Sequence, residues 1–63
     1  MERLVGNLIP GTIFTFAKPS HRGEEKYIRT DMGNLAMQYI YIVNLSTGHI
    51  EEISTTALVN EVN

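Results

Sequence analysis

The segment from Met37 to Leu45 constrains the fold more than any other part of the sequence, because it is a nine-residue β-prone run with two largely apolar faces. In an extended strand alternate side chains point to opposite sides. One side would carry Met37, Tyr39, Tyr41, Val43 and Leu45, and the other Gln38, Ile40, Ile42 and Asn44. A strand of this kind needs cover on both sides, so we expect either a sheet that closes into a barrel or a face that meets a partner.

The length of the chain makes the same demand. A chain of 63 residues forms one domain over residues 1–63, and it buries only about 60% of the surface that its unfolded form exposes. Disulfides cannot help because there is no cysteine, and His21 and His49 lack the paired spacing of a zinc site. Self-association is the remaining aid, so we expect a homo-oligomer.

The first half of the chain contains two further strand candidates. Pro10-Gly11 predicts a turn ahead of the β-branched and aromatic run 12–17, and a polar loop over 18–25 precedes a second run over 26–30. The four residues 31–34 are then expected to turn the chain.

The second half contains the clearest hairpin. Residues 45–49 place Gly48 where a left-handed residue closes a tight turn, and residues 49–54 form the returning strand. Ile50 and Ile53 are out of period-2 register, which suggests a bulge or a strand end between them. The tail, residues 55–63, suits either a helical turn or a last short strand, and its β-branched content favours the strand.

Together these elements predict an all-β domain, a small antiparallel meander of four or five strands. Closing five such strands into an SH3-like barrel removes the exposed edges of an open sheet, so this barrel is the expected fold.

Charge limits the classes of partner. The net charge is −2, and all five Lys and Arg residues precede residue 30. This is one cationic region on an acidic background and not the broad basic footprint of a duplex-binding protein, so we expect no nucleic-acid partner, while a small anion fits. No apolar run reaches the roughly 20 residues of a membrane span, and no signal-like segment opens the chain. With no cysteine, we expect a cytoplasmic protein, in the host cytoplasm if it is viral.

Catalytic groups do not assemble in the sequence. Glu51 and Glu52 are neighbours on a strand and point to opposite faces, so they cannot act as a carboxylate pair. Ser20 and His21 are neighbours on a loop, with no carboxylate placed to orient the imidazole. We therefore expect no enzyme activity, no cofactor and no metal.

The stretch 18–29 is the best candidate for a binding site, because it holds four of the five cations. Arginine forks, a hydroxyl, a glycine and a tyrosine ring suit a phosphate-bearing ligand with a base. The predicted ligand-binding residues are Lys18, Ser20, Arg22, Lys26, Tyr27, Arg29 and, on the long strand, Tyr39. The competing interpretation is a solvated hairpin loop in which Glu24 and Glu25 neutralise the cations.

Tyrosines offer a second ingredient of such a site. Tyr39 and Tyr41 share a face with Met37, and with Tyr27 on the neighbouring strand they could form a floor for a purine. The alternative is that these rings fill a barrel core or an interface.

The stretch from Ile9 to Glu52 resembles a group of small bacteriophage proteins. The resemblance lies in three short motifs, Pro10-Gly11-Thr12-Ile13-Phe14, Glu25-Lys26-Tyr27-Ile28-Arg29-Thr30-Asp31 and Val43-Asn44-Leu45-Ser46-Thr47-Gly48. It implies a small β-barrel, and some such proteins are similar to oligomeric sponges that capture cyclic nucleotide signals of host defence, whereas others inhibit a host protein. No binding residue is transferred from the resemblance, because these motifs are driven by turns.

The leading hypothesis is therefore a non-catalytic, homo-oligomeric anti-defence sponge that sequesters a small anionic ligand such as a cyclic nucleotide. It predicts that Arg22→Ala and Arg29→Ala each abolish binding. The alternative is an inhibitor that binds a host protein through a tyrosine-rich face or through Glu51 and Glu52. A single-stranded nucleic-acid binder is a third hypothesis, which the net negative charge disfavours.

Overall fold

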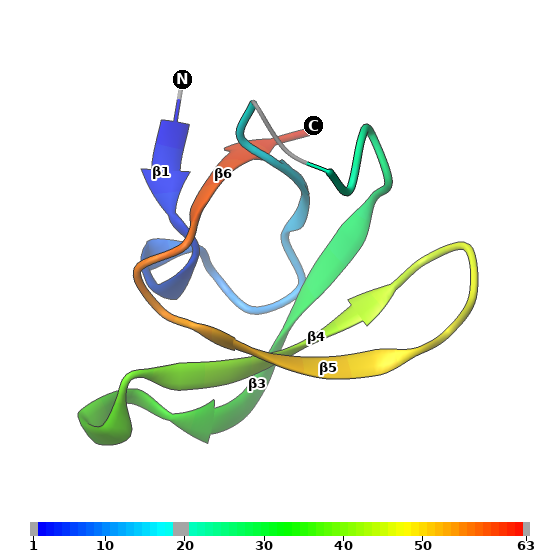
Figure 1. Cartoon of the computed structure of the whole chain (residues 1–63). Coiled ribbons are helices and arrows are strands. Elements are labelled where there is room, and N and C mark those ends of the chain that lie inside the picture. Colours follow the sequence, from blue (N-terminus) through cyan, green and yellow to red (C-terminus); the bar gives the residue numbers. More distant parts are fainter. Residues whose placement is uncertain (1, 19–20, 63) are drawn as a thin grey trace.

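The structure is a computed structural model that describes residues 2–18 and 21–62. Within these residues the chain forms one six-stranded antiparallel sheet with the order β1-β6-β2-β3-β4-β5 (Figure 1). The strands are β1 (Glu2–Leu4), β2 (Ile13–Phe16), β3 (Tyr27–Asn34), β4 (Tyr39–Asn44), β5 (Ile50–Ser54) and β6 (Leu58–Glu61), with 3-10 turns η1 (Val5–Asn7) and η2 (Leu35–Met37). The prediction of a small all-β antiparallel domain is confirmed. The sheet is open, and β1 is a further strand that pairs with β6.

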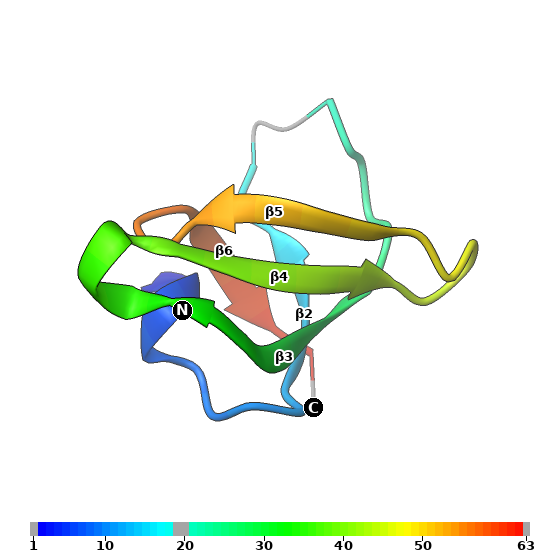
Figure 2. The ribbon, with the colours of Figure 1, turned by 90° about the horizontal axis from the view of Figure 1, so that it is seen from below.

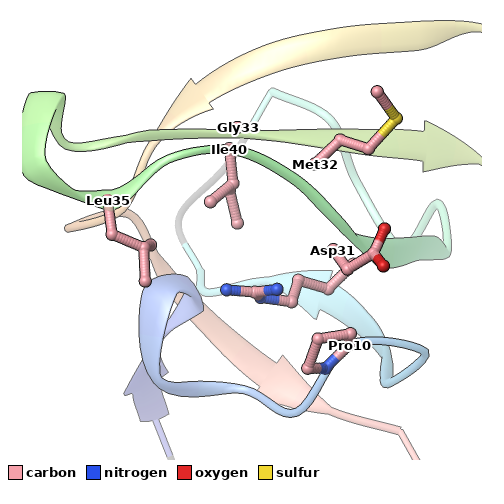
Figure 3. Close-up of a pocket in the computed structure, with 7 residues that line it drawn as sticks. Pro10, Asp31, Met32, Gly33, Leu35 and Ile40 are labelled. Carbon is pink, nitrogen blue, oxygen red and sulfur yellow. The ribbon is translucent and has the colours of Figure 1, made fainter.

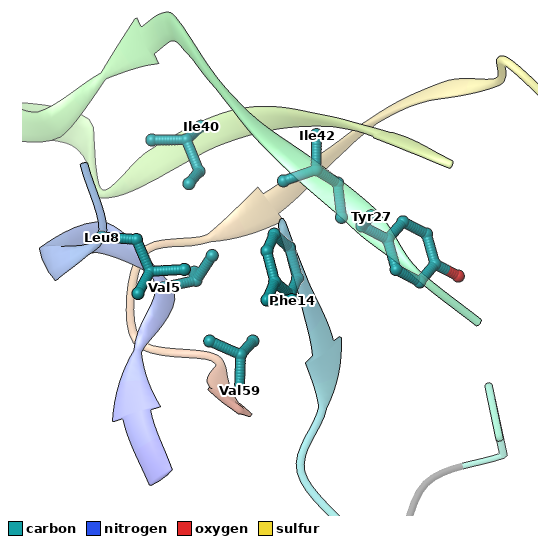
Figure 4. Packing of buried hydrophobic residues seen from close by; sticks show 7 residues of the cluster. All are labelled: Val5, Leu8, Phe14, Tyr27, Ile40, Ile42 and Val59. Atoms are coloured by element: carbon teal, nitrogen blue, oxygen red, sulfur yellow. The ribbon is translucent and has the colours of Figure 1, made fainter. Parts of the chain in front are cut away.

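The sheet folds across itself, so that its two halves enclose the core. Figure 2 shows β3, β4 and β5 side by side, with β2 and β6 crossing behind them at a steep angle. Side chains from both halves point toward one another between the layers (Figure 4). The buried apolar residues are Val5, Leu8, Phe14, Tyr27, Ile40, Ile42 and Val59. A fully buried side chain of this size contributes roughly 1.5–3 kcal/mol, so this cluster is the main stabilising element.

Strand β4 presents its isoleucine face to this core. Ile40, Ile42 and Asn44 are buried, whereas Tyr39, Tyr41 and Val43 are half-buried on the opposite face. The sequence predicted that both faces need cover. The core supplies it on one side only, and the tyrosine side is the outer face of β3, β4 and β5.

The connection between β3 and β4 differs from the expected turn at residues 31–34. These residues continue β3, and the chain turns at η2, where Gln38 adopts a left-handed φ of 63°. The Asn34 side chain accepts a hydrogen bond from the Met37 backbone N–H at 3.1 Å, which stabilises this later turn. Strand β3 is therefore longer than predicted, and β4 begins two residues later than predicted.

A bulge interrupts the pairing of β3 with β4. Arg29 pairs with Ile42 and Gly33 with Ile40, so three residues of β3 lie between pairs that are two positions apart on β4. Gly33 makes this possible: its φ is +136°, and a Cβ there would lie 2.6 Å from the Ile40 Cα. At the bulge Asp31 and Met32 are exposed, whereas the Thr30 hydroxyl still donates to the Tyr41 carbonyl of β4 at 2.7 Å. Bulges of this kind are frequent near binding sites.

The β4–β5 hairpin is confirmed at Gly48, which has a φ of 74° and donates from its N–H to the Asn44 carbonyl at 2.7 Å. The predicted bulge or strand end between Ile50 and Ile53 is wrong, because β5 runs through both residues. Ile50 pairs with Val43 and Ile53 with Ile40 in unbroken register, because Ile53 faces the core side while Ile50 faces outward and is 63% exposed. The favoured reading of the tail is confirmed, since residues 58–61 form β6, between β1 and β2.

Candidate anion-binding site

Arg22, a predicted phosphate ligand, is engaged by the protein itself. Its Nη1 and Nη2 donate to the Glu51 carboxylate at 2.9 and 2.6 Å, and Nη1 also donates to the Tyr27 hydroxyl at 3.1 Å. The guanidinium carbon lies 4.5 Å from the ring centroid of Phe16, within range of a cation–π interaction. Arg22 thus fastens the β2–β3 loop to β5.

This ion pair shifts both titrations. The hydrogen bonds from Arg22 hold the pKa of the Glu51 carboxyl below its usual range, and those to Glu51 raise the pKa of Arg22. A fork-to-fork pair of this kind is among the stronger side-chain interactions. Glu51 is thereby tied to Arg22 on the core side of β5, whereas its neighbour Glu52 pairs with Tyr41 on the outer face.

The other predicted residues of the loop lie in different surroundings. Tyr27 is only 2% exposed, and its ring stacks on Phe14 at 5.9 Å and meets the edge of Phe16 at 5.1 Å, so protein covers the face expected to hold a base. Lys18 is exposed and pairs with Glu24 at 3.3 Å, as the solvated-loop interpretation expects. Ser20 lies outside the described residues.

Two predicted residues lie apart from the loop pocket. Lys26 is exposed just before β3, and Tyr39 lies on the outer face of β4, where its ring meets that of Tyr41 edge to face at 5.8 Å. Lys18 and Arg22 do share an open pocket of about 590 Å³ beside Phe16. The structure therefore does not gather the six predicted residues that it describes into one site.

Arg29 differs from every other cation of the chain, because its side chain turns inward from β3. It is 6% exposed, and its Nη1 donates to the Thr30 carbonyl at 2.7 Å. Its Nε is buried and has no hydrogen-bond partner among the residues that the structure describes. A buried guanidinium without a full set of acceptors carries an uncompensated desolvation cost, which an added anion would reduce.

Arg29 lines a pocket of about 340 Å³, a volume typical of small-ligand sites. The other lining residues are Pro10, Asp31, Met32, Gly33, Leu35 and Ile40 (Figure 3). The pocket lies at the β3 bulge, whose residues Asp31, Met32 and Gly33 line it. Asp31 forms no ion pair within 4 Å in the described part of the chain, and Figure 3 shows its carboxylate on the side of the pocket away from Leu35.

The pocket can therefore bind one anionic group at the guanidinium, with an apolar wall beside it and a hydrogen-bond acceptor at its rim. Sequence reasoning selected Arg29 but missed the rest of the wall. The sequence did contain one sign that Arg29 is buried. Arg29 lies two residues after Tyr27 on the same strand, so the two side chains share a face of the sheet, and Tyr27 is buried on that face.

Other kinds of site receive no support from the described residues. Residues 2–18 and 21–62 contain no group of three His, Cys, Asp or Glu side chains that could hold a metal ion. No helix within them is long and apolar enough to cross a membrane.

Comparison of the chain with protein-family models, with curated proteins and with solved structures found no match.

Proposed function

We propose that this protein is a non-catalytic binding protein that takes a small anionic ligand into the Arg29 pocket. The observation that carries the proposal is the buried Arg29 side chain, whose Nε lacks a partner in the described structure and which opens on a 340 Å³ pocket. Phosphate and carboxylate groups match the planar fork of a guanidinium, and burial strengthens the charge-assisted hydrogen bonds.

The wall of the pocket narrows the class of ligand. Pro10, Leu35 and Ile40 suit an apolar or ring-shaped body, and the Asp31 carboxylate can accept a hydrogen bond from a ligand hydroxyl. A phosphorylated sugar or a cyclic nucleotide has these three parts. A cyclic nucleotide is also the ligand expected from the resemblance to phage sponge proteins. Its base would rest on the apolar wall and not on Tyr27 or Tyr39.

Binding without turnover is proposed because the described lining residues supply only Arg29 and Asp31 as ionisable groups. Neither is paired with a nucleophile or a base in hydrogen-bond reach, which acid–base or nucleophilic catalysis needs. The role of an inhibitor that binds a host protein stays a prediction, in which Glu52 is the exposed carboxylate because Glu51 is bound by Arg22.

The direct test is a nuclear magnetic resonance titration of the ¹⁵N-labelled protein that follows the arginine Nε–H signals. We expect inorganic phosphate and 3′,5′-cyclic AMP to shift the Arg29 Nε–H signal more than that of Arg3, which pairs with Glu61 on an exposed strand. If the Arg29 Nε–H signal keeps its ligand-free position at high concentrations of both compounds, the proposal is refuted.

The matched variants are Arg29→Met and Arg3→Met. Methionine keeps the apolar stem of Arg29 and removes its charge, so the fold should persist while affinity falls at least tenfold, as expected for a lost charge-assisted pair of about 1.5–3 kcal/mol. Arg3→Met should bind like the wild type. Equal affinities in the two variants would show that the anion binds elsewhere, for example at Lys18 and Arg22.

A further inference from the structure

The sheet face opposite the core is a broad apolar surface. Ile28 of β3, Val43 of β4 and Ile50 of β5 pair directly and form one apolar row across the three strands. The row beside it contains Tyr41, and a shallow hollow of about 300 Å³ lies between Thr30, Met32, Tyr41 and Ile50. In a small protein such an apolar sheet face marks an interaction surface.

Two unpaired charges of opposite sign flank this row. Lys26 lies two residues before Ile28, so it shares the outer face, and its carbonyl accepts from the Leu45 N–H at 3.0 Å. Glu52 pairs with Tyr41 on β5. Neither forms an ion pair with any residue in 2–18 or 21–62. Lys26 and Glu52 therefore stand at diagonally opposite corners of the face, on different outer strands and on opposite sides of the apolar row.

We infer that this face binds a second copy of this chain in a twofold-symmetric dimer. A twofold axis that lies in the plane of the face, at about 45° to the strands and across the line from Lys26 to Glu52, exchanges the two charged corners. Strands are about 4.8 Å apart and two residues span about 6.8 Å, so the exchange brings each Lys26 to within about 3 Å, measured in the plane, of the position facing Glu52 of the other copy. The two sheets then cross almost at right angles, which is an established packing of β-sheets.

Self-complementarity singles out a second copy as the occupant. In a symmetric contact every pair occurs twice, so one lysine and one glutamate at opposite corners give two ion pairs around a shared apolar centre. Pairing of two β5 edges is the competing mode, but full antiparallel overlap of the two strands would place Glu52 opposite Glu52 of the other copy, and like charges across a strand pair are unfavourable.

The size of the face sets the strength of the dimer. A standard interface buries about 800 Å² per partner, and three short strands offer less than this, so we expect reversible association with a dissociation constant on the order of micromolar. The inference does not rest on ligand binding by Arg29, because the contact uses neither Arg29 nor Asp31, the charged residues of the pocket. Only Met32 lines both the pocket and the hollow on the outer face.

The test is sedimentation velocity of the full chain over a concentration series at low salt, with Lys26→Glu, Glu52→Lys and the double variant. Each single variant places like charges at both corners, so we expect its dimer to dissociate at least tenfold more readily than the wild type. The double variant restores opposite charges and should dimerise like the wild type. An equimolar mixture of the two single variants should form a mixed dimer, because each then meets the opposite charge.

Lys18→Glu is the control, because Lys18 is an exposed cation on the β2–β3 loop that lines a pocket with Thr56 and Leu58 and not with residues of this face. It should leave the dimer unchanged, and circular dichroism should show all variants folded. A wild-type protein that stays monomeric throughout the series would overturn the inference. Single variants that dimerise like the wild type, or a mixture and a double variant that both stay monomeric, would also overturn it.

Discussion

The Glu51 carboxylate accepts two hydrogen bonds from the guanidinium of Arg22, at 2.9 and 2.6 Å, across 29 positions of the sequence. The pair joins the loop after β2 to strand β5, and both side chains are partly buried. It connects two segments that β3 and β4 separate in the chain. Because of this pair, the stability of the protein should depend on pH in the acidic range.

Because the pKa of Glu51 is lowered in the folded protein, its pairing stabilises the fold fully above the ordinary glutamate pKa of about 4.3, and this stabilisation is lost as the pH falls through the lowered value. We expect Glu51→Gln to remove about 1 kcal/mol at pH 7 and to flatten the loss of stability below pH 4. Thermal unfolding followed across this pH range measures both effects. Glu52→Gln is the control and should keep the wild-type pH profile.

Replacing Arg22 and replacing Arg29 with methionine should have opposite effects on stability and on anion affinity. Arg22→Met breaks the pair with Glu51 and should destabilise the protein by about 1 kcal/mol, while affinity for a small anion stays within threefold of the wild type. Arg29→Met removes a buried charge that lacks a full set of acceptors, so it should lower the affinity for a small anion at least tenfold and leave the stability equal or higher. Denaturant titration and calorimetric binding measure the two quantities. If Arg22→Met lost binding and kept full stability, Arg22 and not Arg29 would be the ligand-binding arginine.

Gly33 should tolerate no side chain. Its φ of +136° is unfavourable for other residues, and an added Cβ would lie 2.6 Å from both the Ile40 Cα and the Tyr39 carbonyl oxygen, neither of which can move freely. We expect Gly33→Ala to cost more than about 2 kcal/mol in the free energy of unfolding. Gly23→Ala, with a φ of +64° and open space around the new methyl group, should cost about 1 kcal/mol. Equal losses in urea unfolding would show that the close approach at the bulge is not needed.

Two isoleucines on paired strands test which face of the sheet is the core. Ile42 has no exposed surface, so Ile42→Val should lower the free energy of unfolding by about 0.5–1.5 kcal/mol. Ile50 is 63% exposed, and Ile50→Val should change the stability of the dilute monomer by less than about 0.5 kcal/mol. Unfolding measured at low protein concentration separates this effect from dimer formation. A larger loss at Ile50 would contradict the orientation of β4 and β5.

Local features of the sequence predicted the strands and most turns. Gly48 permits the left-handed residue of the hairpin, and the β-branched tail extends as β6, because these preferences depend on near neighbours. The turn after β3 was placed too early, since Gly33 serves a close approach within the strand and Gln38 supplies the left-handed residue instead.

Packing between distant segments decided the candidate site. The alternation of residues 39–44 is equally apolar on both sides, and only contact with Phe14 and Val59 in the other half of the sheet makes the Ile40 and Ile42 side the core. In the same way Arg22 and Arg29 are both arginines of the stretch 18–29. Arg22 nevertheless pairs with Glu51, whereas Arg29 lines the pocket beside the β3 bulge. The sequence by itself therefore determined which segments form strands and which stretch of the chain contains the cationic side chains. The tertiary structure decided which face is buried and which arginine has a buried Nε without a partner among the described residues, because both depend on contacts between residues far apart in the chain.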